Sequence, residues 1–198
     1  MNQVVPVAIG AMSTTRYLSP EERARLVAAL PSPRDRLFAI LAANTGFRVS
    51  ELLSFRWHQL MQGGVPVEFV EVARKDLKGG RSRRARRIRS RRVPLNAAAA
   101  LAVKEYAFAL TGGGQPNPNQ WVFASRKRFP GVVSRRHMRD IIHDAARRAA
   151  LVGSIAPHSL RRAFAEDSYR ASGCDIGYEY HPNYCADDRQ QPDRSRRR

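Results

Sequence analysis

The chain has 198 residues, of which 43% are hydrophobic, so it can build one domain around a real core and is not wholly disordered. Its formal net charge of +18 predicts a polyanionic partner, and nucleic acid is favoured over a membrane surface because no basic amphipathic anchor stands out. The sequence has no signal peptide and no apolar run that could span a membrane. Two late cysteines, Cys174 and Cys185, indicate a reducing compartment, the cytoplasm, without a disulfide framework.

The first sixty residues carry clear helix signals. Ser19 and Glu22 form a capping box around a proline, which predicts a helix beginning at residue 20. A second, more apolar helix is predicted through residues 37–41, and Gly46 can supply the left-handed turn that ends it. A third helix is expected directly after Arg48.

Arg48 lies at the junction between two predicted helices, close to apolar neighbours. Such an arginine is either a surface side chain that extends its charge into water or a clamp for an anion. The start of a helix already favours anions, so the two effects would add. Composition alone leaves both interpretations open.

Residues 65–95 read as a strand, a turn at Lys78-Gly79-Gly80 and a second strand, with Val67, Phe69 and Val72 as extended-type residues. Arginines crowd the stretch after the turn. One interpretation is a solvated basic hairpin, and the other is a hairpin that grips DNA phosphates without reading sequence. The candidate DNA-binding residues are Arg81, Arg83, Arg84, Arg86, Arg87 and Arg89.

Two further helices follow this hairpin. Asn96 is predicted to cap a helix over 97–110, and Ser134 a helix that carries arginines on its outer face. His137 and His143 lie on the second of these helices without a metal-type set of neighbours, so both are interpreted as surface or interface residues and no metal is expected.

The last predicted helix begins at Pro157 and should stop near Gly173. His158 and Arg161 fall one turn apart on one face, and Leu160 and Phe164 lie on another that looks core-facing. A histidine and an arginine placed in this way can approach one small anionic group together. Taken alone, however, the pair is better explained as two solvated side chains on a surface helix than as an anion-binding pair.

The two arginine segments together carry a resemblance. Thr45-Gly46-Phe47-Arg48-Val49-Ser50-Glu51-Leu52-Leu53 resembles the first arginine box of the tyrosine recombinases, the phage integrase family. His158-Ser159-Leu160-Arg161 resembles the second box of that family, and the order and separation of the boxes also fit. The resemblance covers roughly residues 15–176 and implies a mainly α-helical catalytic domain with a small antiparallel β-hairpin or sheet (α+β).

The resemblance implies DNA cleavage and rejoining through a 3′-phosphotyrosyl intermediate, without a metal, ATP or another cofactor. Arg48 and Arg161 would stabilise the charge on the phosphate, and His158 would relay a proton. A lysine beside the hairpin turn would protonate the departing 5′-oxygen. Lys78 matches that position best, and Lys75 is the reserve. Arg162 is expected to contact a DNA phosphate or a neighbouring carboxylate.

The pattern breaks after Ile176, where the family continues with a helix, a Gly-His box and the tyrosine nucleophile. His181 echoes that box, but Gln190 stands nine residues beyond it and cannot be a nucleophile. A reading frame shifted near Ile176 is favoured. A degenerate end, or a displaced nucleophile at one of the last tyrosines, are the alternatives. Those tyrosines are Tyr178, Tyr180 and Tyr184.

We therefore expect a loose N-terminus over 1–14, a catalytic domain over 15–176 and an aberrant basic tail over 177–198, with no separate N-terminal DNA-binding domain. The expected partner is double-stranded DNA, and the family usually works as a homotetramer. The chain is expected to bind DNA and to turn over poorly or not at all. The alternatives are a non-catalytic DNA-binding remnant or regulator with the same fold, a basic RNA-binding protein or, more distantly, a phospholipid-surface binder.

Overall fold

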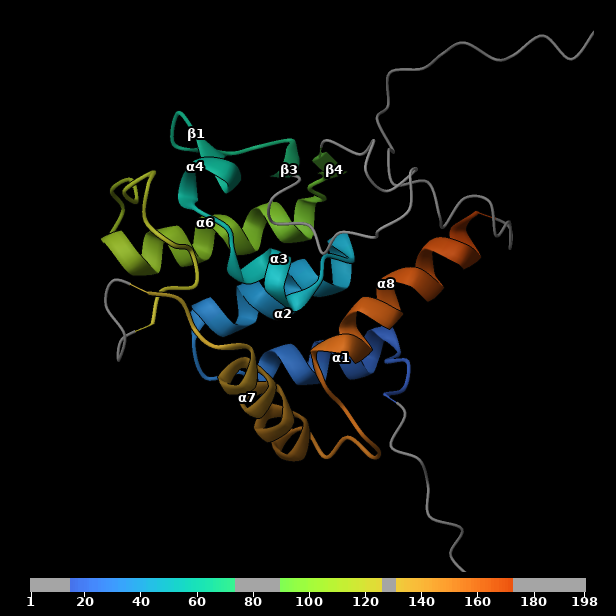
Figure 1. Ribbon diagram of the computed structural model, residues 1–198. Helices are drawn as coiled ribbons and strands as arrows, with labels where there is room; N and C mark the ends of the chain where they lie inside the picture. Colours follow the sequence, from blue (N-terminus) through green and yellow to red (C-terminus); the bar gives the residue numbers. More distant parts are fainter. Residues whose placement is uncertain (1–14, 74–89, 126–130, 173–198) are drawn as a thin grey trace, which may run out of the picture.

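The computed structural model describes residues 15–73, 90–125 and 131–172 of the chain. Helices dominate these residues, and two small antiparallel sheets lie together at one end of the molecule (Figure 1). The mainly α-helical fold with a small antiparallel sheet that the sequence predicts is therefore confirmed. The elements in chain order are α1 (Pro20–Ala28), α2 (Pro33–Thr45), α3 (Val49–Leu53), α4 (Trp57–Leu60), β1 (Met61–Gln62), β2 (Val65–Pro66), β3 (Phe69–Ala73), β4 (Ser90–Pro94), α6 (Ala97–Thr111), α7 (Arg135–Arg148) and α8 (Pro157–Ala171).

Helix α2 is the centre of the domain, and it packs against both α6 and α8. Its apolar residues are almost wholly buried, because the helix has neighbours on more than one side. Phe38 meets Phe123 edge-on, with ring centroids 5.6 Å apart, and so ties α2 to the segment between α6 and α7. The central helix is thus a rigid support for the turn at its C-terminal end.

Side-chain caps begin several of these helices, as the sequence predicts. Ser19 and Glu22 close a capping box at α1. The Asn96 side chain accepts from the backbone of α6, and Ser134 does the same for α7. Each cap satisfies a backbone N–H that the first turn leaves without a helical partner.

The paired strands β3 and β4 confirm the two predicted strands, and the predicted turn at Lys78-Gly79-Gly80 lies outside the described residues. Val70 lies opposite Val93, and Val72 lies opposite Arg91. The sequence did not reveal a second hairpin, β1 with β2, which turns at Gly63-Gly64 with positive φ at both glycines. Val67, expected in the strand, lies between the two hairpins.

No helix in the described part of the chain is long and apolar enough to cross a membrane.

Candidate functional site

The turn between α2 and α3 presents Arg48. Gly46 ends α2 with a φ of +59°, a left-handed conformation that glycine adopts without a side-chain clash. Phe47 follows in the core and meets Phe55 edge-on, with centroids 5.4 Å apart. Arg48 comes next, and 45% of its side chain remains accessible to solvent. The turn therefore anchors the backbone while leaving the guanidinium in reach of a ligand.

Glu51 holds Arg48 from inside the protein. Its carboxylate is fully buried and accepts from the Arg48 backbone N–H at 2.7 Å and from Arg48 Nη1 at 2.9 Å. One carboxylate thus fixes both the backbone and the side chain of the arginine. The helix that begins here, α3, has five residues, so the dipole expected to favour an anion beside Arg48 is that of a short helix.

Helix α8 presents the other two candidate residues. Pro157 occupies its first turn, and buried Ser159 accepts from the Ala156 backbone N–H at 3.3 Å. Leu160 is fully buried and anchors the helix. His158 is exposed and Arg161 is partly buried, one turn along the same helix.

The two predicted boxes meet where α8 packs on the end of α2. A Cβ built on Gly46 would lie 2.3 Å from Phe164 Cδ1, so the ring lies directly against the glycine. Phe164 is one turn beyond Arg161, and Gly46 is two residues before Arg48. A contact between the boxes, which no local sequence pattern could show, therefore sets their relative position.

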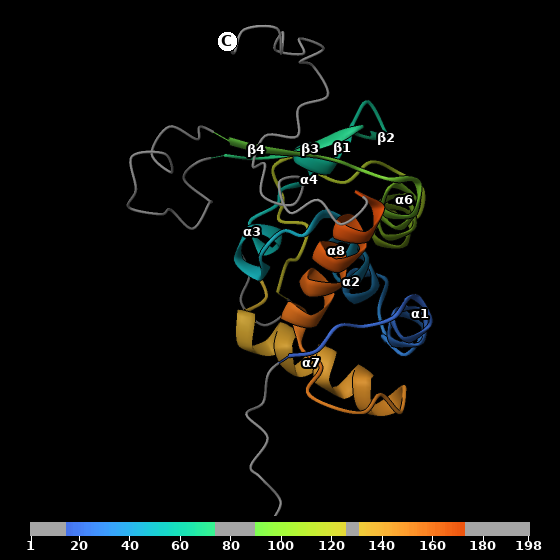
Figure 2. The ribbon, with the colours of Figure 1, turned by 90° about the vertical axis from the view of Figure 1, so that its right-hand side faces the viewer.

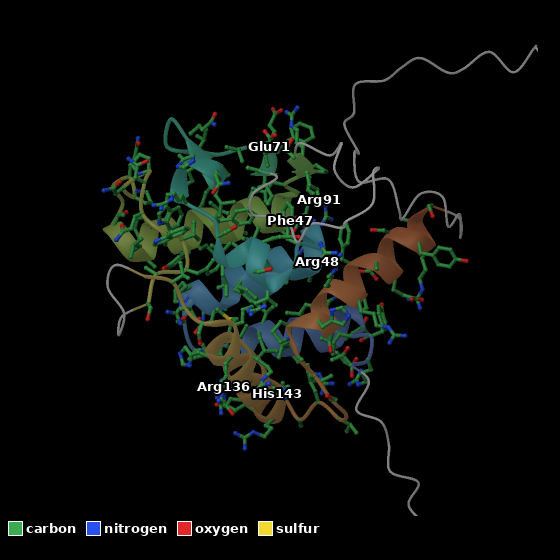
Figure 3. All side chains as sticks on the ribbon, viewed as in Figure 1. Phe47, Arg48, Glu71, Arg91, Arg136 and His143 are labelled. Atoms are coloured by element: carbon green, nitrogen blue, oxygen red, sulfur yellow. The ribbon has the colours of Figure 1, made fainter. Side chains whose placement is uncertain are left out.

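A third arginine that the sequence did not single out lies between the two boxes. Arg91 of β4 donates to the backbone oxygens of Thr45 at 3.1 Å and of Gly46 at 3.4 Å. Its guanidinium lies 4.9 Å from the Phe47 ring centroid, and its Nη1 is 3.8 Å from Glu51 Oε2. Figure 3 shows Phe47, Arg48 and Arg91 gathered on one side of the molecule.

The electrostatics link all three arginines. Burial lowers the pKa of Arg91 most, Glu51 raises it, and the positive charges of Arg161 and Arg48 lower it further. Arg91 stays protonated, because an arginine guanidinium is not deprotonated in proteins. Three segments far apart in the sequence thus place cations near one another, and an anion bound among them would relieve their mutual repulsion.

The remaining predicted site residues lie outside the described residues. These are Lys78 with its reserve Lys75, the arginines Arg81, Arg83, Arg84, Arg86, Arg87 and Arg89, and the tyrosines Tyr178, Tyr180 and Tyr184. The roles of these residues stay predictions from the sequence.

The N-terminal strap, residues 15–18, crosses α8 before α1 begins (Figure 2). Arg162, for which we expect a DNA phosphate or a neighbouring carboxylate as partner, donates to the Thr15 carbonyl at 3.0 Å. The Tyr17 hydroxyl donates to Asp167 at 3.2 Å, and Arg16 donates to the Val152 carbonyl at 2.7 Å. The strap is thus bonded both to α8 and to the loop that precedes it.

In the described ranges, no group of three histidine, cysteine or acidic side chains is placed to hold a metal ion. His137 is exposed and His143 is partly buried, both on α7. Figure 3 places His143 and Arg136 well away from Arg48 and Arg91. His143 and Arg136 are therefore not part of the group formed by Arg48, Arg91 and Arg161.

The sequence profile of the phage integrase family matches residues 16–176, which include both arginine boxes. The chain belongs to the phage integrase family. Tyrosine recombinase XerD of Rhizobium meliloti (strain 1021) is 34% identical over 132 residues, 67% of this chain and 37% of XerD. The resemblance inferred from the two boxes is therefore confirmed.

Solved structures share the fold. XerA recombinase superimposes with a TM-score of 0.62 at 23% identity, over 83% of this chain and 54% of XerA. XerH site-specific recombinase bound to difH substrate gives a TM-score of 0.61 at 17% identity, over 91% of this chain and 50% of XerH. The chain thus spans about half the length of the XerA and XerH structures and 37% of the length of XerD. It corresponds to one part of such proteins.

Proposed function

We propose that this phage integrase family domain cleaves and rejoins DNA strands in site-specific recombination. The observation that carries the proposal is the assembly of Arg48 and Arg161, from distant segments, around Arg91 and Glu51. Family membership and the net charge of +18 support the same conclusion.

The arginines suit the charge of the reaction. A tyrosine oxygen attacks a DNA phosphodiester, the bond to the 5′-oxygen breaks, and a 3′-phosphotyrosyl link forms. Attack adds negative charge to the two non-bridging oxygens, and forked donors from Arg48 and Arg161 would stabilise that charge. The buried carboxylate of Glu51 pre-orients Arg48, so little reorganisation is needed when the charge develops.

Proton transfer completes each step. His158, exposed at the start of α8, would relay a proton to or from the nucleophile or the phosphate. Lys78, or Lys75 in its place, would protonate the departing 5′-oxygen. A 5′-hydroxyl of another strand then attacks the phosphotyrosyl bond and releases the tyrosine. The covalent intermediate conserves the bond energy, so the cycle needs no nucleotide.

A non-catalytic DNA-binding role is the second candidate. One observation favours it: Gln190, which cannot be a nucleophile, occupies the place nine residues beyond His181. A chain without the nucleophile keeps the phosphate site and loses the covalent step. The two candidates therefore differ only in whether a protein–DNA bond forms.

We place the functional unit at residues 15–176, with 1–14 and 177–198 outside it, in line with the match to the family profile. Its partner is double-stranded DNA, since XerH is bound to difH substrate in its structure. A cytoplasmic location, which the two cysteines predict, is compatible with a DNA substrate. Assembly as a homotetramer on DNA follows from the resemblance to the family.

The proposal is tested by fluorescence anisotropy with the full chain and random-sequence duplex DNA, duplex RNA and anionic vesicles. Arg48→Ala and Arg161→Ala are expected to weaken DNA binding about tenfold each. Arg25→Ala removes the same charge from an exposed position on α1 and is the matched control. Equal binding of all three variants, with preference for RNA or vesicles, would overturn the proposal.

The covalent step has its own assay. Duplexes selected from a random library by binding are nicked, incubated with the chain and analysed in denaturing gels. A protein–DNA adduct that is lost when the tyrosines are replaced by phenylalanine supports the recombinase. Tight binding without an adduct selects the non-catalytic candidate.

A further inference from the structure

Arg91 differs from the arginines around it in where its side chain points. Side chains alternate along a strand, and in β4 the inward positions are Arg91 and Val93. Arg92 is exposed and stacks over Phe69 at 4.1 Å. Only 21% of the Arg91 side chain remains accessible. Arg91 is therefore part of the interior, beside the site, and is not a free surface cation.

The hydrogen bonds of Arg91 are directed at the backbone that carries Arg48. Its guanidinium reaches two consecutive carbonyls, those of Thr45 and Gly46, which end α2. The planar fork of arginine fits two neighbouring acceptors, whereas a lysine ammonium is a point charge. The face of the guanidinium lies over Phe47, so three consecutive residues are held by one side chain.

Glu51 connects Arg91 to Arg48. The carboxylate bonds Arg48 directly and lies 3.8 Å from Arg91. One carboxylate can neutralise only one of these two cations. An additional anion beside Arg48 is therefore favoured, and Arg91 contributes to that attraction without giving up its bonds to the carbonyls.

We propose that Arg91 is a positioning residue of the DNA phosphate site. It ties the β3–β4 sheet to the turn at Thr45–Phe47 and shares Glu51 with Arg48, and so it holds Arg48 toward the phosphate. Arg91 itself acts through Arg48, because its donors are directed at the two carbonyls. The inference rests on the proposed function, since it assumes that Arg48 binds a DNA phosphate.

The first test is a double-mutant cycle in duplex DNA binding, measured by anisotropy on the full chain. Arg91→Ala is expected to weaken binding about tenfold, as Arg48→Ala does, and the double variant should lose little more. Arg92→Ala is the matched control, because it removes the same charge from the opposite face of the same strand. Its effect should be small and additive with that of Arg48→Ala.

Arg91→Lys supplies a readout that a purely structural role would not give. A lysine at this place would meet the charges that act on Arg91, namely Glu51 of α3, Arg48 before α3 and Arg161 of α8. Lysine starts from a pKa of about 10.4, so burial and the like charges would bring its titration toward neutral pH. DNA binding by Arg91→Lys should therefore weaken more steeply with rising pH than binding by the unchanged protein.

The outcomes separate the inference from the proposed function. If Arg48→Ala and Arg161→Ala weaken binding while folded Arg91→Ala binds normally, or if Arg91→Ala and Arg48→Ala add fully, only the inference fails. If Arg48→Ala and Arg161→Ala leave binding unchanged, the proposed function fails. Should Arg91→Ala not fold, the pH profile of Arg91→Lys decides: a flat profile overturns the inference.

Discussion

Phe164 of α8 lies directly against Gly46, where a Cβ would fall 2.3 Å from the ring. This contact joins the helix of His158 and Arg161 to the turn of Arg48. The relative placement of these candidate residues therefore depends on a glycine that bears no functional group.

Gly46→Ala is expected to destabilise the protein for two reasons. The φ of +59° costs about 1–2 kcal/mol for any L-residue with a Cβ, and the clash with Phe164 adds about 1–3 kcal/mol of overpacking. Gly63→Ala is the matched control, because Gly63 has a φ of +58° and nothing within 4 Å of its Cβ position. Urea denaturation should show a clearly larger loss at Gly46, and equal losses would refute the packing argument.

Glu51→Gln tests the buried carboxylate between Arg48 and Arg91. The substitution keeps the side-chain shape but removes the charge that offsets two cations, so we expect a loss of about 1–3 kcal/mol in the free energy of unfolding. Glu71→Gln removes an exposed carboxylate from β3 and should change stability little. A stable Glu51→Gln protein would mean that the cations do not need this carboxylate.

Glu22 makes stability depend on pH. The side-chain hydrogen bond from Arg16 is the largest cause that lowers the Glu22 pKa from 4.5 to about 2. A carboxyl with a depressed pKa in the folded state adds stability that is complete above about pH 4.5 and is lost as the pH falls toward 2. Both side chains remain partly exposed, at 34% for Arg16 and 22% for Glu22, so salt will weaken the effect.

The corresponding measurement compares melting temperatures of Glu22→Gln and the unchanged protein from about pH 5 to pH 2. The gap between the two curves should narrow as the pH falls. Glu105→Gln, an exposed change on α6, should follow the unchanged protein more closely. A constant gap at all pH values would show that Glu22 acts by packing and not by charge.

The arginines after the predicted turn give a prediction about salt. Replacing Arg81, Arg83 and Arg84 by glutamine should lower the slope of log affinity against log salt by about 0.9 for each phosphate contact removed. The loss should be the same for unrelated duplex sequences, because phosphate contacts carry little sequence information. A control with three exposed cations elsewhere replaced, Arg25, Lys104 and Arg147, should keep more of the slope. Equal losses of slope in the two triple variants would mean that DNA binding depends on overall charge and not on phosphate contacts of this hairpin.

Local chemistry made the helices predictable. The side chains of Ser19, Asn96 and Ser134 cap helix starts through hydrogen bonds to backbone N–H groups three residues further on. Gly46 marks a helix end because it adopts a positive φ. The hairpin β1–β2 was not predicted because each of its strands has only two residues and β2 contains Pro66. The pair Gly63-Gly64 did give a turn signal.

The site was predictable only in part. His158 and Arg161 are one turn apart on one helix, so periodicity brings them together. Arg48 and Arg161 both lie near Arg91 only because α8 packs on α2. Arg91 was obscured by the run of arginines. Its alternation with Val93 in a half-buried strand was the available signal, but whether an inward arginine can find acceptors depends on the tertiary structure.

The strap at residues 15–18 has a mechanical consequence. Thr15 and Tyr17 are bonded to Arg162 and Asp167 of α8, and Arg16 to the loop before that helix. A tension applied to the chain ahead of Thr15 is therefore shared between α8, which Thr15 and Tyr17 contact, and α1, which Arg16 contacts through Glu22. Pulling on the N-terminal end would therefore act directly on α8, the helix that carries the proposed phosphate-site residues His158 and Arg161.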